Sequence, residues 1–565
     1  MSQSILIKNI DRGLDSSIRD AAKLPVGSAA DGSQNCFYND GSIRTPYGFA
    51  KLLSGSLPLD SGANVLGLFV FSELDKTQHL LAVTLNKIYD KNNQVGTWDD
   101  KTQSGVALGA MLANPVSSAT ILHTDGLLLN GTGSDLWYNH CLVCNGVTPI
   151  QRWAGKYETD FADLKGGDGY HDTGSTYYST NKTHFALQVG AFYNRPLLIS
   201  PKESDANDNL IACNQRIRWP QAGKLESWSG TGSGFIDLLD TGGFNIWGAL
   251  LGTQWIQYQN NSIWSLTHVG GTTVFAPNIE MPDLGLLAPH LLYSKNNAHY
   301  FVGNDFNIYA YYGGANYKNI GTKIHRYLQR DLDPAYASRS WLCMGANNQR
   351  LWLFIVPNGQ TSITMAYSID LQNGSWQKRD FTHKWDSVGE GMTAVALVGA
   401  SSYVTGQTYA EALATGETYA NAVITGKTYE QLLETILTKE VLTIGDSAGY
   451  VYQADEDLIQ DDGIDIPMQH ITEIYDLGVP SKNKLWPGIR VTAKGTAITV
   501  SYRYGSFETI ATGWTALSTQ ALTTELVDYD FFINDTSKKI QFKFTGTDFE
   551  IADFELIEPA LEGEV

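Results

Sequence analysis

The stretch that decides the fold runs from Arg350 to Phe381 and has the sequence RLWLFIVPNGQTSITMAYSIDLQNGSWQKRDF. Its first part, through Val356, is apolar on both faces, which is typical of a buried strand. A second strand is expected at 363–369, and Asn373-Gly374 favours a tight reversal after it. Similar units of short antiparallel strands recur along the chain without obvious sequence identity, which predicts a β-propeller whose blades have diverged.

The length and composition favour a multidomain protein rich in strands. A chain of 565 residues is too long for one ordinary core, so two or three domains are expected. The 55 glycines and the 11% of aromatic residues favour turns and strands over long helices. The formal net charge is −20, from 59 acidic and 39 basic residues, and such a surface repels nucleic acid. This charge argues against a DNA-binding role, although a protein that lets DNA pass without adhering would be acidic for the same reason.

The number of cysteines and the length of the apolar runs indicate in which cellular compartment the chain is made and whether it spans a membrane. Five cysteines, an odd number, are scattered over the chain and form no disulfide framework, so reduced thiols are expected. The N-terminal segment MSQSILIKNIDRG holds no apolar stretch long enough for a signal peptide. No run approaches the ~20 apolar residues of a membrane span. The sequence therefore predicts a soluble chain that is made in the cytosol and has no membrane span.

Two domains are predicted, and the boundary follows a change in strand pattern. Residues 1–465 are expected to form the propeller, with an N-terminal arm, a long insertion near 152–182 and a repeat insertion near 404–440. From 466 to 565 the alternating runs lengthen, which favours a separate β-sandwich. Its strands are expected at 489–493, 497–504, 527–533, 539–544 and 549–557. The acidic segment 455–465 is expected to be a solvated hinge between the two domains.

A ten-residue repeat begins at Thr405 and is echoed twice. Its units are expected to form short helical turns, each started by a Thr cap and stopped by the next glycine, which lead into a helix at 429–437. Tyr409, Tyr419 and Tyr429 recur at one spacing. Exposed aromatic residues in such an insertion mark a partner surface, but these tyrosines would also serve to hold the repeat to its own propeller. Both interpretations stay open.

No motif for catalysis or cofactor binding stands out. The patterns GxSxG, HExxH and GxxxxGKS are absent, and the eleven histidines are dispersed. Cys141 and Cys144 form the one CxxC pair, but no second ligand pair accompanies it, so two reduced core cysteines are preferred over a zinc site. The acidic segment 455–465 lacks the glycine and glutamate spacing of a calcium loop. No catalytic residue, cofactor or metal ion is expected, and the protein is not expected to be an enzyme.

Several patterns together give the chain a resemblance to a known family. They are DGSIRTPYG from Asp40, RIRWPQAGKLESW from Arg216, FVGND from Phe301 and NGSW from Asn373. This combination resembles the tail nozzle proteins, or tail tubular proteins B, and the DNA-stabilising plug proteins of short-tailed bacteriophages. The repeat at 404–440 is similar to the Thr-Trp/Gly repeats often inserted into such phage propellers, with Tyr in place of Trp. The resemblance covers most of the chain.

The resemblance implies a distorted β-propeller with added β domains and a structural role in the virion. Such a protein is expected to form a ring, here a homo-hexamer, at the distal end of the tail, beside adaptor, fibre or needle proteins. The lumen closes behind packaged DNA and opens for ejection. The acidic balance suits this role, because a negative lumen avoids phosphate contacts that would stall the duplex.

Two alternatives stay open. The first is another virion role, as a collar, adaptor or receptor-binding protein, for which surface aromatic residues should gather on one propeller face. The second is a carbohydrate-active propeller enzyme, whose carboxylates should converge over the central channel.

Overall fold

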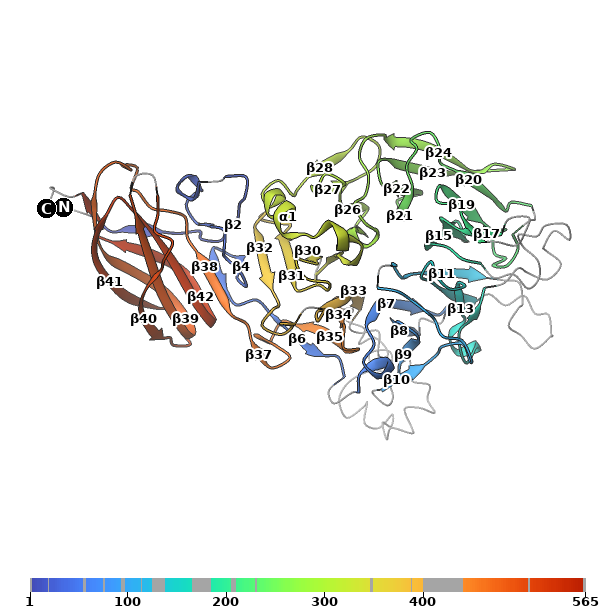
Figure 1. Cartoon of the computed structure of the whole chain (residues 1–565), viewed down its shortest axis with the longest axis horizontal. Coiled ribbons are helices and arrows are strands. Elements are labelled where there is room, and N and C mark those ends of the chain that lie inside the picture. The colour runs from blue at the N-terminus through green and yellow to red at the C-terminus, as the bar shows by residue number, and fades with distance from the viewer. Residues whose placement is uncertain are drawn as a thin grey trace, which may run out of the picture.

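The molecule is a β-propeller with a β-sandwich beside it (Figure 1). The computed structural model describes every residue except 1–2, 19, 54–56, 75–76, 93–96, 113, 124–137, 165–183, 205–209, 229–230, 346–348, 388, 400–439, 507–508 and 562–565. Within the described residues, seven blades of four antiparallel strands form the propeller; six of them are four-stranded sheets, and the other belongs to a six-stranded sheet. The predicted fold class, all-β with an irregular propeller and a C-terminal sandwich, is confirmed.

Each blade is a meander of short strands, as the alternation of apolar runs and turn residues predicted. The first blade consists of β7 (Val65–Ser72), β8 (Gln78–Thr84), β9 (Ile88–Asn92) and β10 (Thr97–Asp100). The second consists of β11 (Ser117–His123), β12 (Tyr138–Cys144), β13 (Gln151–Trp153) and β14 (Ala162–Asp163). The third consists of β15 (Gln188–Phe192), β16 (Arg195–Ile199), β19 (Arg216–Trp219) and β20 (Gly234–Asp237). The fourth blade consists of β21 (Asn245–Leu251), β22 (Gln254–Gln259), β23 (Ile263–Gly270) and β24 (Val274–Met281). The fifth consists of β25 (Leu292–Lys295), β26 (Ala298–Val302), β27 (Ile308–Tyr311) and β28 (Tyr317–Asn319). The sixth consists of β29 (Trp341–Met344), β30 (Arg350–Ile355), β31 (Met365–Asp370) and β32 (Trp376–Asp380). The seventh blade joins β33 (Met392–Gly399), β34 (Glu440–Asp446) and β35 (Val451–Asp455) to β6 (Gly48–Lys51). The first strands of successive blades contact one another and β33 contacts β7, so the ring of blades is closed.

The sixth blade contains the stretch that decides the fold. All six residues of β30 are buried, as expected of a run that is apolar on both faces. Gly374 takes a φ of +71° in the turn between β31 and β32, a conformation that glycine adopts without strain. Two strands of the N-terminal arm, β2 (Gly13–Leu14) and β3 (Ser28–Ala29), extend the outer edge of this blade in parallel. A Cβ at Gly13 would collide with the carbonyl oxygen of Trp376, so the close approach of the arm requires glycine there.

The seventh blade is completed by pairing between distant parts of the chain. β6 is its outer strand, with Gly48 opposite Asp455 and Lys51 opposite Tyr452. The N–H of Gly48 also donates to the carbonyl of Leu458 at 2.7 Å, and a Cβ at Gly48 would overlap the carbonyl oxygen of Gln460. The N-terminal and C-terminal ends of the propeller therefore hold each other in place.

The C-terminal domain is built on two long strands, β39 (Lys484–Gly505) and β42 (Lys539–Ile557). β41 (Val527–Ser537) pairs with the first half of β39, and β40 (Thr515–Ala521) pairs with its second half. The two halves of β42 face each other across the domain core, since the rings of Phe544 and Phe554 lie 5.6 Å apart. One pair of bent strands thus supplies both layers of the sandwich.

Four of the strands predicted in this domain are in fact two. The runs at 489–493 and 497–504 both belong to β39, and those at 539–544 and 549–557 both belong to β42. The prediction of separate strands is wrong because the chain bends at bulges while its pairing continues. Gly495 lies at this bend with a φ of +128°, close against the main chain of Asp548.

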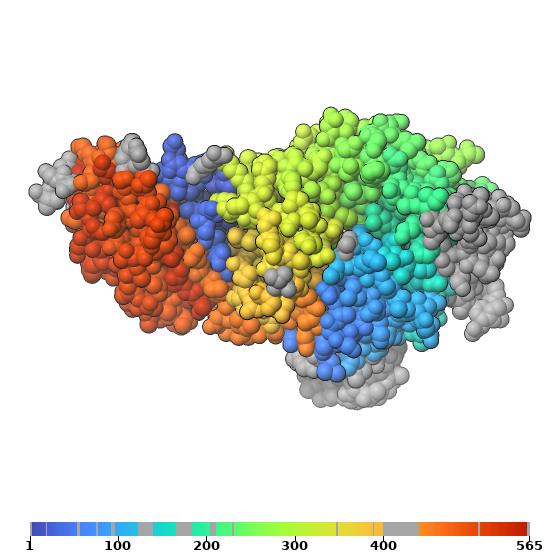
Figure 2. All heavy atoms as spheres, in the orientation of Figure 1, coloured from blue at the N-terminus to red at the C-terminus, as the bar shows by residue number. Residues whose placement is uncertain are grey.

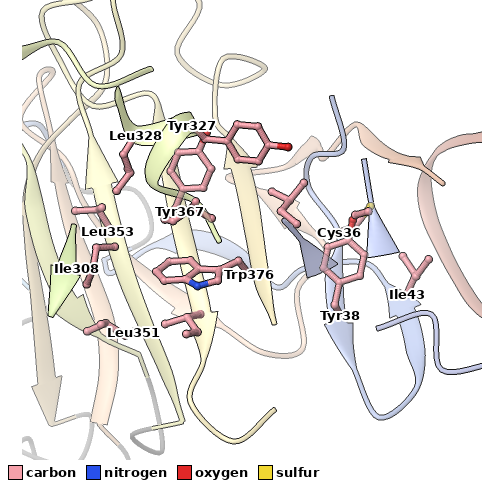
Figure 3. Close-up of a cluster of buried hydrophobic side chains, with 14 of the residues drawn as sticks. Cys36, Tyr38, Ile43, Ile308, Tyr327, Leu328, Leu351, Leu353, Tyr367 and Trp376 are labelled. Carbon is pink, nitrogen blue, oxygen red and sulfur yellow. The ribbon is translucent and has the colours of Figure 1, made fainter. Parts of the chain in front are cut away.

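The N-terminal arm belongs to both domains, so the sandwich is not confined to residues 466–565. β38 (Met468–Ile471) pairs with β42, and so does β1 (Ile5–Ile7) of the arm. The arm also contains a hairpin of β4 (Phe37–Asn39) and β5 (Ser42–Arg44), and β5 pairs with β42 as well. In the upper part of Figure 2 the dark blue arm lies between the red sandwich and the yellow sixth blade. Figure 3 shows Trp376 of that blade and Cys36, Tyr38 and Ile43 of the arm, all members of one buried cluster that continues into the sandwich.

The predicted insertions are only partly described. The segment 152–182 does not begin as an insertion, because β13, a short 3₁₀ helix (Gly155–Tyr157) and β14 complete the second blade. Its remainder, 165–182, lies outside the described residues, as do nearly all of the repeat near 404–440 and the expected helix at 429–437. The sequence did not predict the one α-helix that the described residues contain, α1 (His325–Asp331), which lies between the fifth and sixth blades.

The remaining described elements are short. They are the strands β17 (Lys202–Ser204), β18 (Leu210–Ala212), β36 (Gln460–Asp461), β37 (Ile464–Asp465) and β43 (Ala560–Leu561), and 3₁₀ helices at Ala21–Lys23, Leu59–Ser61, Pro289–Leu291 and Pro334–Arg339. A search of the described helices for a segment long and apolar enough to span a membrane finds none.

Candidate functional site

The three tyrosines of the repeat, Tyr409, Tyr419 and Tyr429, lie outside the described residues. Whether they form a partner surface or hold the repeat to the propeller therefore stays a prediction. The described strands on either side, β33 and β34, pair directly, with Gly399 opposite Glu440. The segment thus leaves and re-enters the seventh blade at one hairpin, as an insertion does.

The cysteines of the CxxC pair lie on opposite faces of β12. Cys141 belongs to the core between the first and second blades, and Cys144 to the core between the second and third. Residues three apart in a strand point in opposite directions, so the two thiols cannot bind one metal ion. Burial raises the pKa of Cys144 to about 12, which keeps that thiol protonated. No cluster of metal-binding side chains occurs among the residues that the structure describes.

In the acidic segment 455–465, Glu456, Asp457 and Asp465 are exposed, but Asp461 is held by a buried ion pair, so the prediction of a solvated hinge is wrong at Asp461. The Asp461 side chain is 1% exposed and that of Arg379 2% exposed, with 2.8 Å between Oδ2 and Nη2. The same Oδ2 lies 2.8 Å from Nε2 of His383, and Oδ1 accepts the N–H of Phe49 at 3.1 Å. Desolvation lowers the pKa of Arg379, and the carboxylate opposes that effect. Asp461 therefore clamps β6 to the sixth blade. The run of acidic residues in the sequence does not indicate this role.

A second buried ionic cluster joins the first two blades. Nδ1 of His79 lies 2.8 Å from Asp90 and Nε2 lies 3.0 Å from Glu73, which also accepts the N–H of Lys156 at 2.8 Å. Burial alone would lower the pKa of His79, but the hydrogen bonds to the two carboxylates outweigh it and raise the pKa to about 9. The ring stacks on Phe71 at 5.7 Å. None of these residues lines either of the cavities described next, so the cluster acts as a cross-link between blades.

A cavity of about 310 Å³ lies among the innermost strands of the propeller. It is lined by Leu68, Phe69, Val70, Ser118, Trp247, His290, Leu292, Tyr293, Trp341, Leu342, Cys343, Val395, Ala396 and Leu397. A smaller hollow of about 20 Å³ shares His290 and Trp341 with it. The lining of the larger cavity includes no Asp or Glu, so the converging carboxylates of a glycoside hydrolase are not found there. The enzyme alternative gains no support from this cavity and stays a prediction.

The C-terminal sheet has two free edges among the described residues. At the level of Ile489 the strand order is β41, β39, β42 and β1. β41 pairs only with β39, and β1 pairs only with β42, so the outer side of each strand presents unpaired main-chain groups. Because all three pairings are antiparallel, β41 and β1 run in opposite directions. The edge strand of the other layer, β40, has no buried residue at all.

Apolar side chains lie at both free edges on the outer face of this sheet. One row of opposed residues crosses the face, from Leu6 through Glu555 and Arg490 to Asp530. Phe532 lies two residues beyond Asp530 and so projects from the same face. Leu6 is 47% exposed and Phe532 is 66% exposed, while ion pairs of Arg490 fill the middle of the face. The sequence predicted a strand at 527–533 but could not show that it and β1 are opposite edges of one sheet.

The fold defines the chain as a β-propeller protein with an added β-sandwich. No family model matches its sequence, and no curated protein matches it by sequence. Among solved structures, YCF48 from Cyanidioschyzon merolae is similar, with a TM-score of 0.34 and 9% identity, over 70% of this chain and 97% of that chain. A glycoside hydrolase family 43 arabinoxylan arabinofuranohydrolase from Bacillus subtilis is similar with a TM-score of 0.24 and 8% identity, over 88% of this chain and 96% of that chain. TM-scores this low carry no argument about function.

Proposed function

We propose that this protein is a structural component of a phage tail, which assembles into the ring-shaped nozzle that retains packaged DNA and opens for ejection. The observation that carries the proposal is the pair of free edges, β41 and β1, on opposite sides of one sheet. Two different surfaces that fit each other allow head-to-tail contact between copies, and such contacts close into a ring when the rotation between copies permits. The resemblance to tail nozzle proteins supplies the biological setting.

The proposed contact joins the β41 edge of one copy to the β1 edge of the next. Since the two strands run in opposite directions, the antiparallel alternation of the sheet continues across the contact. Phe532 of one copy then lies beside Leu6 of the next, and the two exposed apolar side chains cover each other. The only partner that this contact requires is a second copy of the chain.

The charge of the protein sets the conditions for assembly. Copies that each carry a formal charge of −20 repel one another, and added salt screens this repulsion. Ring formation should therefore strengthen with ionic strength. The same charge keeps the phosphates of passing DNA from adhering to the lumen. A ring of six copies located in the virion tail, beside adaptor, fibre or needle proteins, is part of the proposal.

The test is the mass of the purified chain in solution, measured by light scattering at low and physiological salt, with electron microscopy of the product. We expect a mass of six times 62.0 kDa and a ring with a hole wide enough for a DNA duplex. Lysine on an edge strand blocks edge pairing, so the double variant Val527→Lys, Phe532→Lys should stay monomeric. Leu239→Lys is the matched control, since Leu239 is 58% exposed on the propeller, and it should still form rings. A wild-type monomer at both salt concentrations, or rings formed by the double variant, would contradict the proposal.

A further inference from the structure

The larger cavity of the propeller has aromatic side chains in a wall of mixed polar and apolar surface. Trp247, Tyr293 and Trp341 contribute three aromatic rings from three different blades or blade junctions. None of the lining residues is Asp, Glu, Lys or Arg. The groups that could ionise stay neutral near pH 7, because burial lowers the pKa of His290 to about 3 and raises that of Cys343 to about 12. The cavity therefore offers no opposite charge to a charged molecule.

One histidine in this wall has no hydrogen-bond partner among the residues that the structure describes. His290 is 7% exposed, and none of the hydrogen bonds among the described residues involves its ring nitrogens. The ring is fixed in place, stacked on Trp341 with 3.6 Å between centroids and 7° between planes, and touching Trp247 at 5.1 Å with its plane at 64°. The ring nitrogens are not among the fully buried side-chain atoms that lack a partner, so they are accessible from the cavity, where this fixed imidazole can exchange a hydrogen bond with a ligand atom.

We propose that the central cavity binds a small, uncharged, planar aromatic molecule that packs against these rings and exchanges one hydrogen bond with His290. An engineered cavity of about 150 Å³ suffices to bind benzene, so the volume of about 310 Å³ here has room for a bicyclic molecule. A charged ligand would lose its hydration without gaining a counter-charge, whereas an aromatic ligand gains offset or edge-on ring contacts. The site lies in the propeller and does not depend on the proposed ring of subunits.

The test uses indole as the probe and measures its binding to the full chain by titration calorimetry. Benzothiophene has the same shape without the N–H, and indole-3-carboxylate adds a charge. We expect indole to bind saturably, benzothiophene to bind about three- to tenfold more weakly because one neutral hydrogen bond is lost, and indole-3-carboxylate to bind at least about tenfold more weakly. Binding of indole should not change between pH 5 and 8, because His290 stays neutral over that range.

Two variants assign the binding to this cavity. His290→Leu removes the hydrogen bond, so indole and benzothiophene should bind it equally. Tyr312→Leu is the control, since Tyr312 is 45% exposed and outside the cavity lining, and it should bind like the wild type. Circular dichroism establishes that each variant is folded. The proposal is overturned if indole shows no saturable binding to the wild type, or if the wild type does not distinguish indole from benzothiophene, a comparison that needs no variant to fold.

Discussion

The substitution Asp461→Asn tests whether a buried ion pair holds the propeller closed. Asp461 lies in the segment that follows the seventh blade, and its carboxylate meets the guanidinium of Arg379 at 2.8 Å and the imidazole of His383 at 2.8 Å. It also accepts the N–H of Phe49 in β6. Asparagine has nearly the same shape and can still accept that N–H. It removes the negative charge and directs an amide donor at two groups that are themselves donors.

The expected cost follows from burial. The Asp461 and Arg379 side chains are 1% and 2% exposed, so solvent cannot replace the lost carboxylate. Breaking a buried ion pair by removing one partner costs about 3 to 5 kcal/mol, because the remaining charge is left without compensation. The neighbouring Asp462 pairs with Lys384 at 2.6 Å and with Lys51 at 3.8 Å, but its side chain is 25% exposed. A pair open to solvent contributes at most about 1 kcal/mol, so Asp462→Asn serves as a matched control.

Urea unfolding followed by tryptophan fluorescence measures the global effect, and hydrogen exchange measures the local one. We expect Asp461→Asn to lower the free energy of unfolding by about 3 to 5 kcal/mol and Asp462→Asn to lower it by no more than about 1 kcal/mol. If the clamp on β6 opens locally, exchange of the β6 amides should speed up by roughly 100-fold or more in Asp461→Asn. Strands of the third and fourth blades should change less.

A double variant separates loss of the ion pair from a change of shape. Arg379→Met removes the buried charge that Asp461→Asn leaves uncompensated, so the double variant should recover at least about 1 kcal/mol relative to Asp461→Asn alone. The clamp argument fails if Asp461→Asn is as stable as Asp462→Asn. It also fails if exchange in β6 stays at the wild-type rate, or if the double variant is no more stable than Asp461→Asn.

Three further substitutions test other buried contacts by unfolding experiments. His79→Gln should lower the free energy of unfolding by roughly 3 kcal/mol at pH 6, because the pKa of His79 is raised from 6.5 to about 9 and each pKa unit corresponds to ~1.36 kcal/mol. A raised pKa stabilises the fold fully below pH 6.5, and this stabilisation is lost as the pH rises through about 9. The difference in stability between variant and wild type should therefore nearly vanish at pH 10. Lys484→Met should cost about 3 kcal/mol because the buried ammonium donates to three carbonyl oxygens at 2.6 to 2.8 Å, whereas the exposed Lys482→Met should change stability by less than about 0.5 kcal/mol. Gly48→Ala should cost more than about 2 kcal/mol because its Cβ meets main chain, while Gly513→Ala, with open space around it, should be nearly neutral; equal stability of the two glycine variants would contradict the packing of β6.

The sequence predicted those parts of the fold whose cause is local. A run that is apolar on both faces and ends at a glycine-containing turn specifies β30 wherever it lies in the chain, and the fully buried strand was found where expected. β6 carries no such information about its partner. Its four residues pair with β35 about 400 positions later, and only the closed ring of blades brings them together. The same limit applies to the candidate assembly surface, because 527–533 was predicted as a strand but its place at the edge depends on β39 and β42.

Buried charge was the other feature that sequence patterns misjudged. Acidic runs are usually solvated, and that expectation is correct when their counter-charges are distant. Here Asp461 meets an arginine 82 positions earlier in the chain, and folding removes both from water. His290 is a similar case, since nothing near it in the sequence distinguishes it from the other histidines. Its importance comes from a cavity that six separate strands and the 3₁₀ helix at Pro289–Leu291 create.

The course of the N-terminal arm argues that propeller and sandwich are one folding unit. The arm gives β1, β4 and β5 to the sandwich, β2 and β3 to the sixth blade, and β6 to the seventh. A cut after residue 465 would leave β42 without two of its partner strands, β1 and β5, and would expose the buried surface of Tyr38 and Ile43. Neither product would retain the cluster that includes Trp376 in the propeller and Phe544 in the sandwich. The proposed contact between copies therefore acts on a sandwich that is joined to the propeller by strand pairing and by a shared core, not by a flexible linker.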